Sequence, residues 1–86
     1  KYDMARQALR IDRCLARIHP EDPRIHYNLA CSLSLLGRKR EAVAALSRAI
    51  ELGYDDMPWL LQDPDLLPLN NHSAFKSLVA EQKCSF

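Results

Sequence analysis

The sequence predicts an all-α fold built from antiparallel helices, and three observations carry this prediction. Apolar residues recur at steps of three and four, the spacing that places side chains on one face of a helix. Glycines and prolines are few, two and five respectively, which favours helices joined by few turns. Asp-Pro pairs at 22–23 and 63–64 supply an N-cap followed by a proline, the residue types that begin helices.

The first helix is predicted over Asp3–Ile18. Pro20 ends it, because a proline disfavours helical geometry in the residue before it. An apolar stripe opposite a charged one is typical of a helix that packs on one side and meets water on the other. The apolar stripe consists of Met4, Ala8, Ile11, Leu15 and Ile18. The basic stripe consists of Arg6, Arg10, Arg13 and Arg17.

The next two helices are predicted to form a tight antiparallel hairpin. The second begins at Asp22-Pro23 and ends before Gly37, and the third runs from about residue 38 or 39 to Leu52, before Gly53. A link of one or two residues forces neighbouring helices to run antiparallel. The expected inward residues of the second helix are Ile25, Leu29, Ala30, Leu33 and Leu36. Those of the third helix are Ala42, Val43, Leu46, Ala49, Ile50 and Leu52.

Beyond Tyr54 the predicted elements become short. Asp55 or Asp56 would cap a brief helix, and the Asp63-Pro64 pair would begin another turn. A last helix is expected over residues 72–82. The brief helix carries Met57, Leu60, Leu61 and Trp59, of which Trp59 is expected to be buried. The expected inward residues of the last helix are Ala74, Phe75, Leu78 and Val79.

Length and composition set the class of protein. The chain has 86 residues, the scale of one domain, with 48% hydrophobic and 27% charged residues, as in a globular protein. Twelve basic and eleven acidic side chains give a net charge of +1, which excludes a globally basic nucleic-acid binder. No apolar run approaches the roughly 20 residues of a membrane-spanning helix. The first residues also lack the apolar stretch of a signal peptide. We therefore expect a cytoplasmic protein with no membrane partner.

The residue types that carry catalysis or bind metals do not stand in the patterns that such chemistry requires. The cysteines, Cys14, Cys31 and Cys84, form no C-x-x-C pair and are expected to be reduced thiols. The three histidines match no H-E-x-x-H or Cys/His zinc spacing. Two glycines do not make a phosphate-binding loop, and the aspartate pairs are explained by helix capping. The sequence therefore predicts no enzyme, no small-molecule substrate, no cofactor and no metal.

The chain carries a partial internal repeat. A shift of 34 residues places Ala8 on Ala42, and the match stops after the third helix. This period, together with helical hairpins, resembles the tetratricopeptide repeat (TPR) family. Residues 23–56 are similar to one full unit, whose signature positions are filled by His26, Leu29, Ala30, Leu33, Ala42 and Leu46. The resemblance implies a right-handed solenoid of about one and a half repeats. Residues 1–20 would be the second helix of a partial repeat, and residues 57–82 a C-terminal capping segment.

The resemblance to the TPR family also implies a function. Members typically bind peptides on the concave surface lined by the first helix of each unit. The chain is therefore expected to be a non-catalytic protein–protein interaction scaffold whose partner is a protein or a peptide. The Asn28 amide suits such a surface, because one amide both donates and accepts hydrogen bonds. Carried over by position, the candidate peptide-binding residues are Arg24, Tyr27, Asn28, Cys31 and Ser34.

Three other interpretations stay open. In the first, the chain forms a homodimer through the apolar surface that the incomplete first unit leaves open. The candidate self-association residues are Met4, Ala8, Ile11 and Leu15. In the second, the chain is only the structural C-terminal cap of a longer TPR-containing protein. In the third, the basic stripe of the first helix docks an acidic partner or a nucleic acid. Nucleic acid is disfavoured, because no aromatic residues interleave with the arginines.

Overall fold

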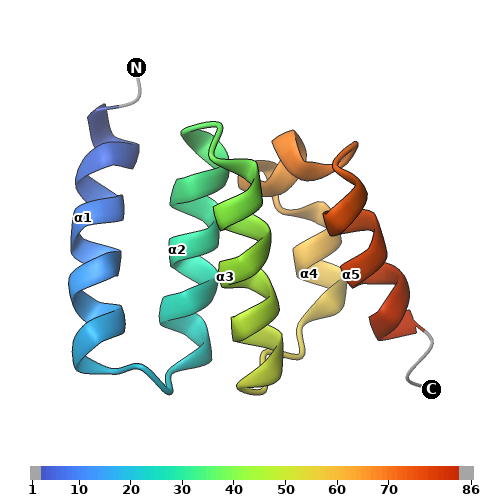
Figure 1. The fold of residues 1–86 in the computed structure, drawn as a ribbon, viewed down its shortest axis with the longest axis horizontal. Helices are drawn as coiled ribbons and strands as arrows, with labels where there is room; N and C mark the ends of the chain where they lie inside the picture. Colours follow the sequence, from blue (N-terminus) through green and yellow to red (C-terminus); the bar gives the residue numbers. More distant parts are fainter. Residues whose placement is uncertain (1–2, 84–86) are drawn as a thin grey trace.

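The structure, a computed structural model, describes residues 3–83 (Figure 1). It confirms the all-α prediction, because the described residues form helices joined by short turns and include no strand. Residues 1–2 and 84–86, and with them Cys84, lie outside the described part. The helices are α1 (Asp3–Ile18), α2 (Pro23–Leu35), α3 (Lys39–Glu51), α4 (Met57–Gln62), the 3₁₀ helix η1 (Pro64–Leu69) and α5 (Ser73–Lys83).

The ends of the helices follow the predicted caps and glycines. The Asp22 side chain accepts a hydrogen bond from the backbone N–H of Arg24 at 2.9 Å, and Pro23 occupies the first position of α2. Helices α2 and α3 are each followed by a glycine with positive φ, 77° at Gly37 and 112° at Gly53. The N–H groups of each glycine and of the next residue bond the last carbonyls of the helix. These local signals explain why predicted and observed bounds agree to within a residue or two.

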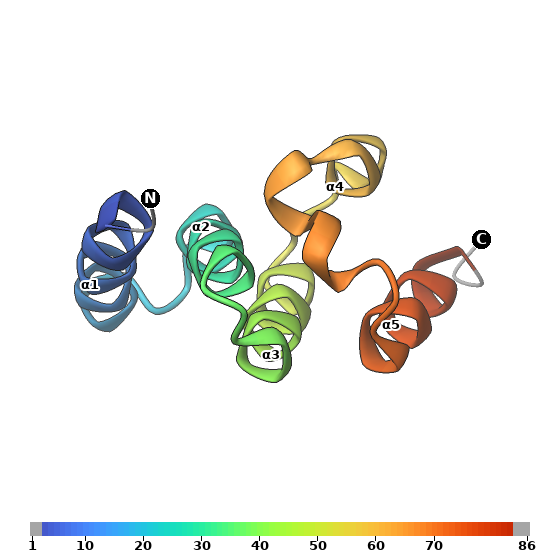
Figure 2. The ribbon, with the colours of Figure 1, turned by 90° about the horizontal axis from the view of Figure 1, so that it is seen from above.

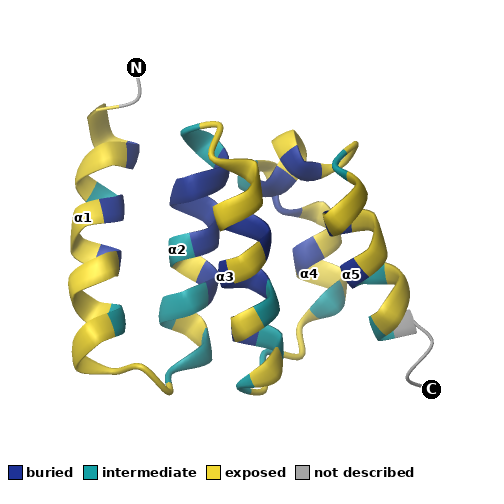
Figure 3. Cartoon of the chain, in the orientation of Figure 1, coloured by how far each residue is buried: buried dark blue, intermediate teal, exposed yellow. Residues whose placement is uncertain are grey.

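The core lies between α2 and α3, which pack as the predicted antiparallel hairpin. Ala30 of α2 and Ala42 and Ala49 of α3 are completely buried, and Leu46 fills the space beside them. Because the alanine side chain is a single methyl group, the two helix backbones can approach closely at these positions. Buried positions are dense along α2 and α3 and sparse on the outer side of α1 (Figure 3).

Helix α4, η1 and α5 form a closing segment, in which η1 packs against α2 and α3, α5 packs against α3, and α4 packs against η1. The prediction that Trp59 is buried is wrong, since its side chain is 48% exposed. Asp56 caps α4 by accepting a hydrogen bond from the Trp59 backbone N–H. Successive helix residues point about 100° apart, so the residue next to a buried leucine faces outward. Leu60 takes the inward position instead, and Ala74 of α5 also faces solvent. The buried apolar side chains of the segment are Leu60, Leu66, Leu69, Phe75 and Leu78.

Helix α1 contacts α2 through a different stripe from the apolar one that the sequence analysis selected. The contact stripe is weakly apolar, because it combines a leucine and an alanine with an acidic residue. Its buried members are Ala5, Leu9 and Asp12. The selected apolar stripe is left uncovered, with exposed fractions of 82% for Met4, 60% for Ile11, 36% for Leu15 and 63% for Ile18.

Replacement of Ala42 by leucine is expected to lower the free energy of unfolding by about 1–3 kcal/mol, because the added carbons must enter a completely buried site. Ala44 lies on the exposed side of the same helix. Ala44→Leu is therefore the matched control, with an expected change below about 0.5 kcal/mol. Urea unfolding followed by circular dichroism measures both variants. Equal stabilities would contradict the observed rotation of α3.

Candidate functional site

A groove of about 560 Å³ runs along α2. Helix α2 forms its floor, α1 forms one wall, and the junction of α4 and η1 forms the other. Seen from above in Figure 2, α2 lies between α1 and α4, with α4 above it and α3 below. The lining residues are Met4, Ala5, Ala8 and Asp12 of α1, Tyr27, Asn28, Cys31, Ser32 and Leu35 of α2, and Trp59, Asp63 and Asp65 of the second wall.

Three of the five predicted peptide-binding residues line the groove, and the other two, the first and the last in sequence, do not. Tyr27, Asn28 and Cys31 all line the groove, and the Asn28 side chain is exposed there. Arg24 is exposed at the start of α2 but does not line the groove. Ser34 is buried in the core, and its hydroxyl has no hydrogen-bond partner among the described residues.

Asp63 is the central polar group of the groove, although its sequence context predicts only a capping role. The Tyr27 hydroxyl donates to Asp63 Oδ2 over 2.6 Å, and the Cys31 thiol donates to the same oxygen over 3.7 Å. Asp63 Oδ1 accepts the backbone N–H of Asp65 at 2.9 Å and so caps η1. Through these bonds Asp63 ties the floor of the groove to its wall. Tyr27 and Asp63 are 36 residues apart in sequence, so no local pattern could reveal their contact.

The Tyr27 ring is itself held in place from the other side. It stacks on the ring of Tyr54, with centroids 4.4 Å apart and an angle of 11° between the planes. Tyr54 directly follows Gly53 at the end of α3, and its backbone N–H bonds the Ala49 carbonyl. Because stacking restrains the ring, the Tyr27 hydroxyl has a fixed direction toward Asp63.

Burial changes the acid–base chemistry of the groove. Loss of water, reinforced by the charge of Asp63, raises the pKa of the Cys31 thiol well above its ordinary value. The thiol is therefore protonated at physiological pH and is a poor nucleophile. Cys31, Asp63 and Asp65 also offer ligand atoms within 4.8 Å of one another. Within this cluster the Cys31 thiol donates a hydrogen bond to Asp63 Oδ2.

Within residues 3–83, the groove is lined by carboxylates and by no lysine or arginine. Asp12, Asp63 and Asp65 belong to its lining. Burial raises the pKa of Asp12, although the hydrogen bond from Ser32 acts in the opposite direction. Burial also raises the pKa of Asp65, and the negative charge of Asp63 raises it further. Ion pairs lie outside the groove lining, where they join Arg13 to Glu41, Arg38 to Glu41 and Arg48 to Glu51.

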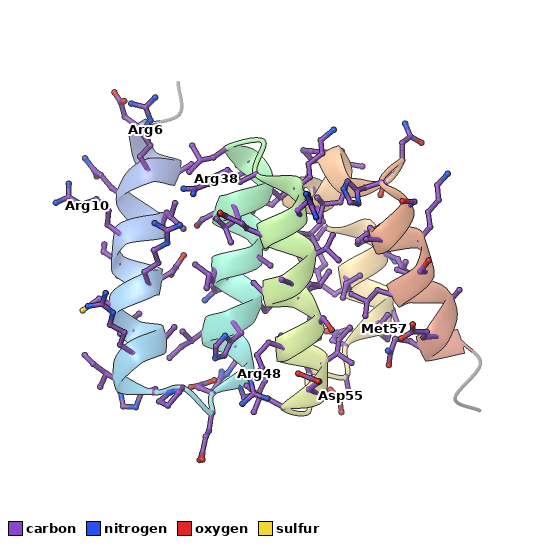
Figure 4. The ribbon with its side chains drawn as sticks, in the orientation of Figure 1. Arg6, Arg10, Arg38, Arg48, Asp55 and Met57 are labelled. Atoms are coloured by element: carbon purple, nitrogen blue, oxygen red, sulfur yellow. The ribbon has the colours of Figure 1, made fainter. Side chains whose placement is uncertain are left out.

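The basic stripe of α1 lies beside a separate hollow. Arg6 and Arg10 surround it together with Arg38 at the start of α3 (Figure 4). Arg13 is partly neutralised, since it pairs with Glu41 at 3.7 Å, while Arg17 is exposed. The docking of an acidic partner or a nucleic acid at this stripe stays a prediction.

Comparisons with known proteins give a partial match. No protein-family profile matches the chain, and no solved structure matches it significantly. A curated relative, a chloroplastic protein of Arabidopsis thaliana, is 34% identical over 68 residues. The match covers 78% of this chain and 20% of the relative, so the chain spans about a fifth of that protein's length. None of the helices within residues 3–83 has the length and apolar character needed to cross a membrane. The cytoplasmic location stays a prediction.

Replacement of Asp12 by asparagine is expected to raise the Tm at neutral pH. The difference in Tm between the variant and the native chain should disappear at acidic pH. Because the pKa of Asp12 is raised in the folded state, folding opposes its ionisation, and this cost is fully present above the folded pKa. Asparagine keeps an oxygen for the Ser32 hydroxyl, which donates to Asp12 Oδ2 at 2.9 Å, but carries no charge. As the pH falls, the carboxyl is protonated in both states, so the difference should vanish near about pH 3.

Thermal unfolding across this pH range measures the effect of Asp12→Asn. The exposed Asp55 lies outside the groove, and Asp55→Asn is the control that should show no such trend. A constant difference in Tm between the Asp12 variant and the native chain at all pH values would contradict the assigned cost of ionisation.

Proposed function

We propose that this chain is a non-catalytic protein–protein interaction module that binds a peptide or protein segment along α2. The observation that carries the proposal is the groove itself, with exposed Trp59 and Met4 on its walls and the Asn28 amide on its floor. Binding sites typically combine a largely apolar lining with a few polar groups that fix orientation. A bound segment would cover the Trp59 ring and exchange hydrogen bonds with Asn28.

The proposed architecture is a TPR-like, right-handed solenoid. Its support is the α2–α3 hairpin, where small side chains are completely buried at the close approach that the repeat pattern predicts. On this proposal residues 1–20 are the second helix of a partial repeat, residues 23–56 a full repeat and residues 57–82 the capping segment. A rigid hairpin with a closing segment against it would present a preformed groove, which lowers the entropic cost of binding.

The absence of catalysis is part of the proposal. Cys31, which lines the groove, carries a protonated thiol. Asp22, Asp56 and Asp63 accept backbone N–H groups at helix starts, which accounts for their positions without a chemical step. The module would act by holding a partner in place.

Replacement of Asn28 by alanine is expected to weaken the binding of groove-directed peptides by about fivefold, the effect of one lost hydrogen bond. Peptides without tryptophan are selected from a displayed random library against the 86-residue chain. Their affinities follow from the fluorescence of Trp59, the single tryptophan. Asn71 is exposed in the turn before α5, so Asn71→Ala is the matched control. A library without binders, or equal affinities for both variants, would contradict the proposal.

Self-association is a second candidate function, favoured by the uncovered apolar stripe of α1. Met4, Ile11 and Leu15 are exposed there, and Ala8 is half-buried at the edge of the groove. A contiguous apolar stripe in water favours contact with another apolar surface. A second copy of the chain would cover it in a homodimer. A preceding helix would cover it in a longer array, and the chain would then be the structural cap.

Sedimentation equilibrium tests the homodimer directly. The expected result is a mass that rises with concentration, and Ile11→Gln should shift the equilibrium to the monomer, because it removes apolar area from the contact. Arg17→Gln, on the basic stripe of the same helix, is the matched control and should leave the equilibrium unchanged. A monomer at every concentration would contradict self-association through this stripe.

A further inference from the structure

Asp12 holds a charge that the described part of the chain does not neutralise. Its side chain is nine-tenths buried in the wall of the groove, and its Oδ2 atom accepts a hydrogen bond from Ser32. No lysine, arginine or histidine within residues 3–83 forms an ion pair with it. Carboxylates are rarely buried to this extent unless they are paired with a cation. The position of Asp12 therefore points to a positive charge that is supplied from outside.

Two further carboxylates face the same space. Asp63 and Asp65 stand two residues apart at the start of η1, and both line the groove. The Asp63 oxygens accept bonds from Tyr27, Cys31 and the Asp65 backbone, while the Asp65 carboxylate is only partly buried. Neighbouring negative charges in partly dehydrated surroundings repel one another, and a cation between them relieves that repulsion.

The second wall adds an aromatic surface to these charges. Trp59 lines the same groove as the carboxylates and is 48% exposed. An exposed indole attracts an ammonium or guanidinium group through the negative face of its ring. It also packs against the long aliphatic stem of a lysine or arginine side chain. An acidic side chain would gain neither contact and would be repelled by three aspartates.

We propose that the segment bound in the groove is basic and that it places an arginine or lysine side chain among Asp12, Asp63 and Asp65, with Trp59 against its stem. This inference rests on the proposed function, since it states the chemistry of the segment that the groove receives. An arginine guanidinium satisfies two carboxylates at once through its forked N–H groups, so arginine should bind more tightly than lysine.

Synthetic heptapeptide pools test the charge requirement. Each pool has a fixed central residue, either arginine, lysine, citrulline or glutamate, flanked by random alanine, leucine, serine and phenylalanine, with both ends blocked. Titration of the 86-residue chain is followed by Trp59 fluorescence in buffer that contains EDTA. The arginine pool should bind about tenfold more tightly than the citrulline pool, which keeps the shape and loses the charge. The glutamate pool should bind most weakly, and added salt should reduce the advantage of arginine.

Substitutions in the two walls of the groove, with a control outside it, locate the effect. Asp65→Asn removes one charge from the lining and keeps the backbone N–H that Asp63 accepts, so it should reduce the advantage of arginine over citrulline several-fold. Asp55→Asn removes an exposed charge outside the groove and should leave that advantage unchanged. Circular dichroism verifies that both variants fold, and Asp12→Asn provides a second variant from the opposite wall.

The outcomes separate this inference from the proposed function. Equal binding of the arginine and citrulline pools would overturn the basic segment and leave the groove as a peptide site. An arginine advantage that survives both Asp65→Asn and Asp12→Asn would also overturn it, by placing the cation elsewhere. Failure of every pool, together with failure of the displayed library, would overturn the proposed function itself.

Discussion

The hydrogen bond from Tyr27 to Asp63 is the contact on which the shape of the groove depends. Asp63 lies where α4 ends and η1 begins, so fixing its carboxylate fixes both short helices against α2. Tyr27 is held in turn by its stack on Tyr54, which follows α3. One buried contact therefore joins floor, wall and hairpin, and the loss of this hydrogen bond to a carboxylate would cost about 1.5–3 kcal/mol.

This contact depends on the close packing of the hairpin beneath it. Helix α4 and η1 have six residues each, too few to be stable as isolated helices, so they depend on packing against longer elements. The α2–α3 hairpin supplies that support, since Ala30, Ala42 and Ala49 let its helices approach without a gap. Leu66 and Leu69 of η1 are buried in the same core, while their carboxylate neighbour Asp63 stays at the groove.

Local chemistry made most of the fold predictable from the sequence, and long-range contacts account for what was missed. Asp22 with Pro23, and the glycines after α2 and α3, set helix ends through backbone constraints that neighbouring residues determine. The outward position of Trp59 depends on how α4 meets the hairpin. The pairing of Asp63 with Tyr27 depends on a fold that the local sequence does not specify. Within the candidate site, Tyr27, Asn28 and Cys31 of α2 were predicted by the resemblance to the TPR family, whereas both walls had to be seen in the structure.

The rotation of α1 about its own axis determines which of its side chains line the groove, and therefore which charge this wall carries. Successive residues of a helix are about 100° apart, so the stripe that contacts α2 decides which neighbours face the groove. With Ala5 and Leu9 against α2, Asp12 enters the groove wall and Arg6 and Arg10 fall on the other side of the contact. Had the more apolar stripe packed against α2, Asp12 would have turned away from the groove. The chain instead leaves Met4 and Ile11 in water and stabilises Asp12 by the Ser32 hydroxyl. The packing of α1 therefore adds Asp12 to the two carboxylates of the opposite wall, Asp63 and Asp65, and the same packing leaves the apolar stripe exposed.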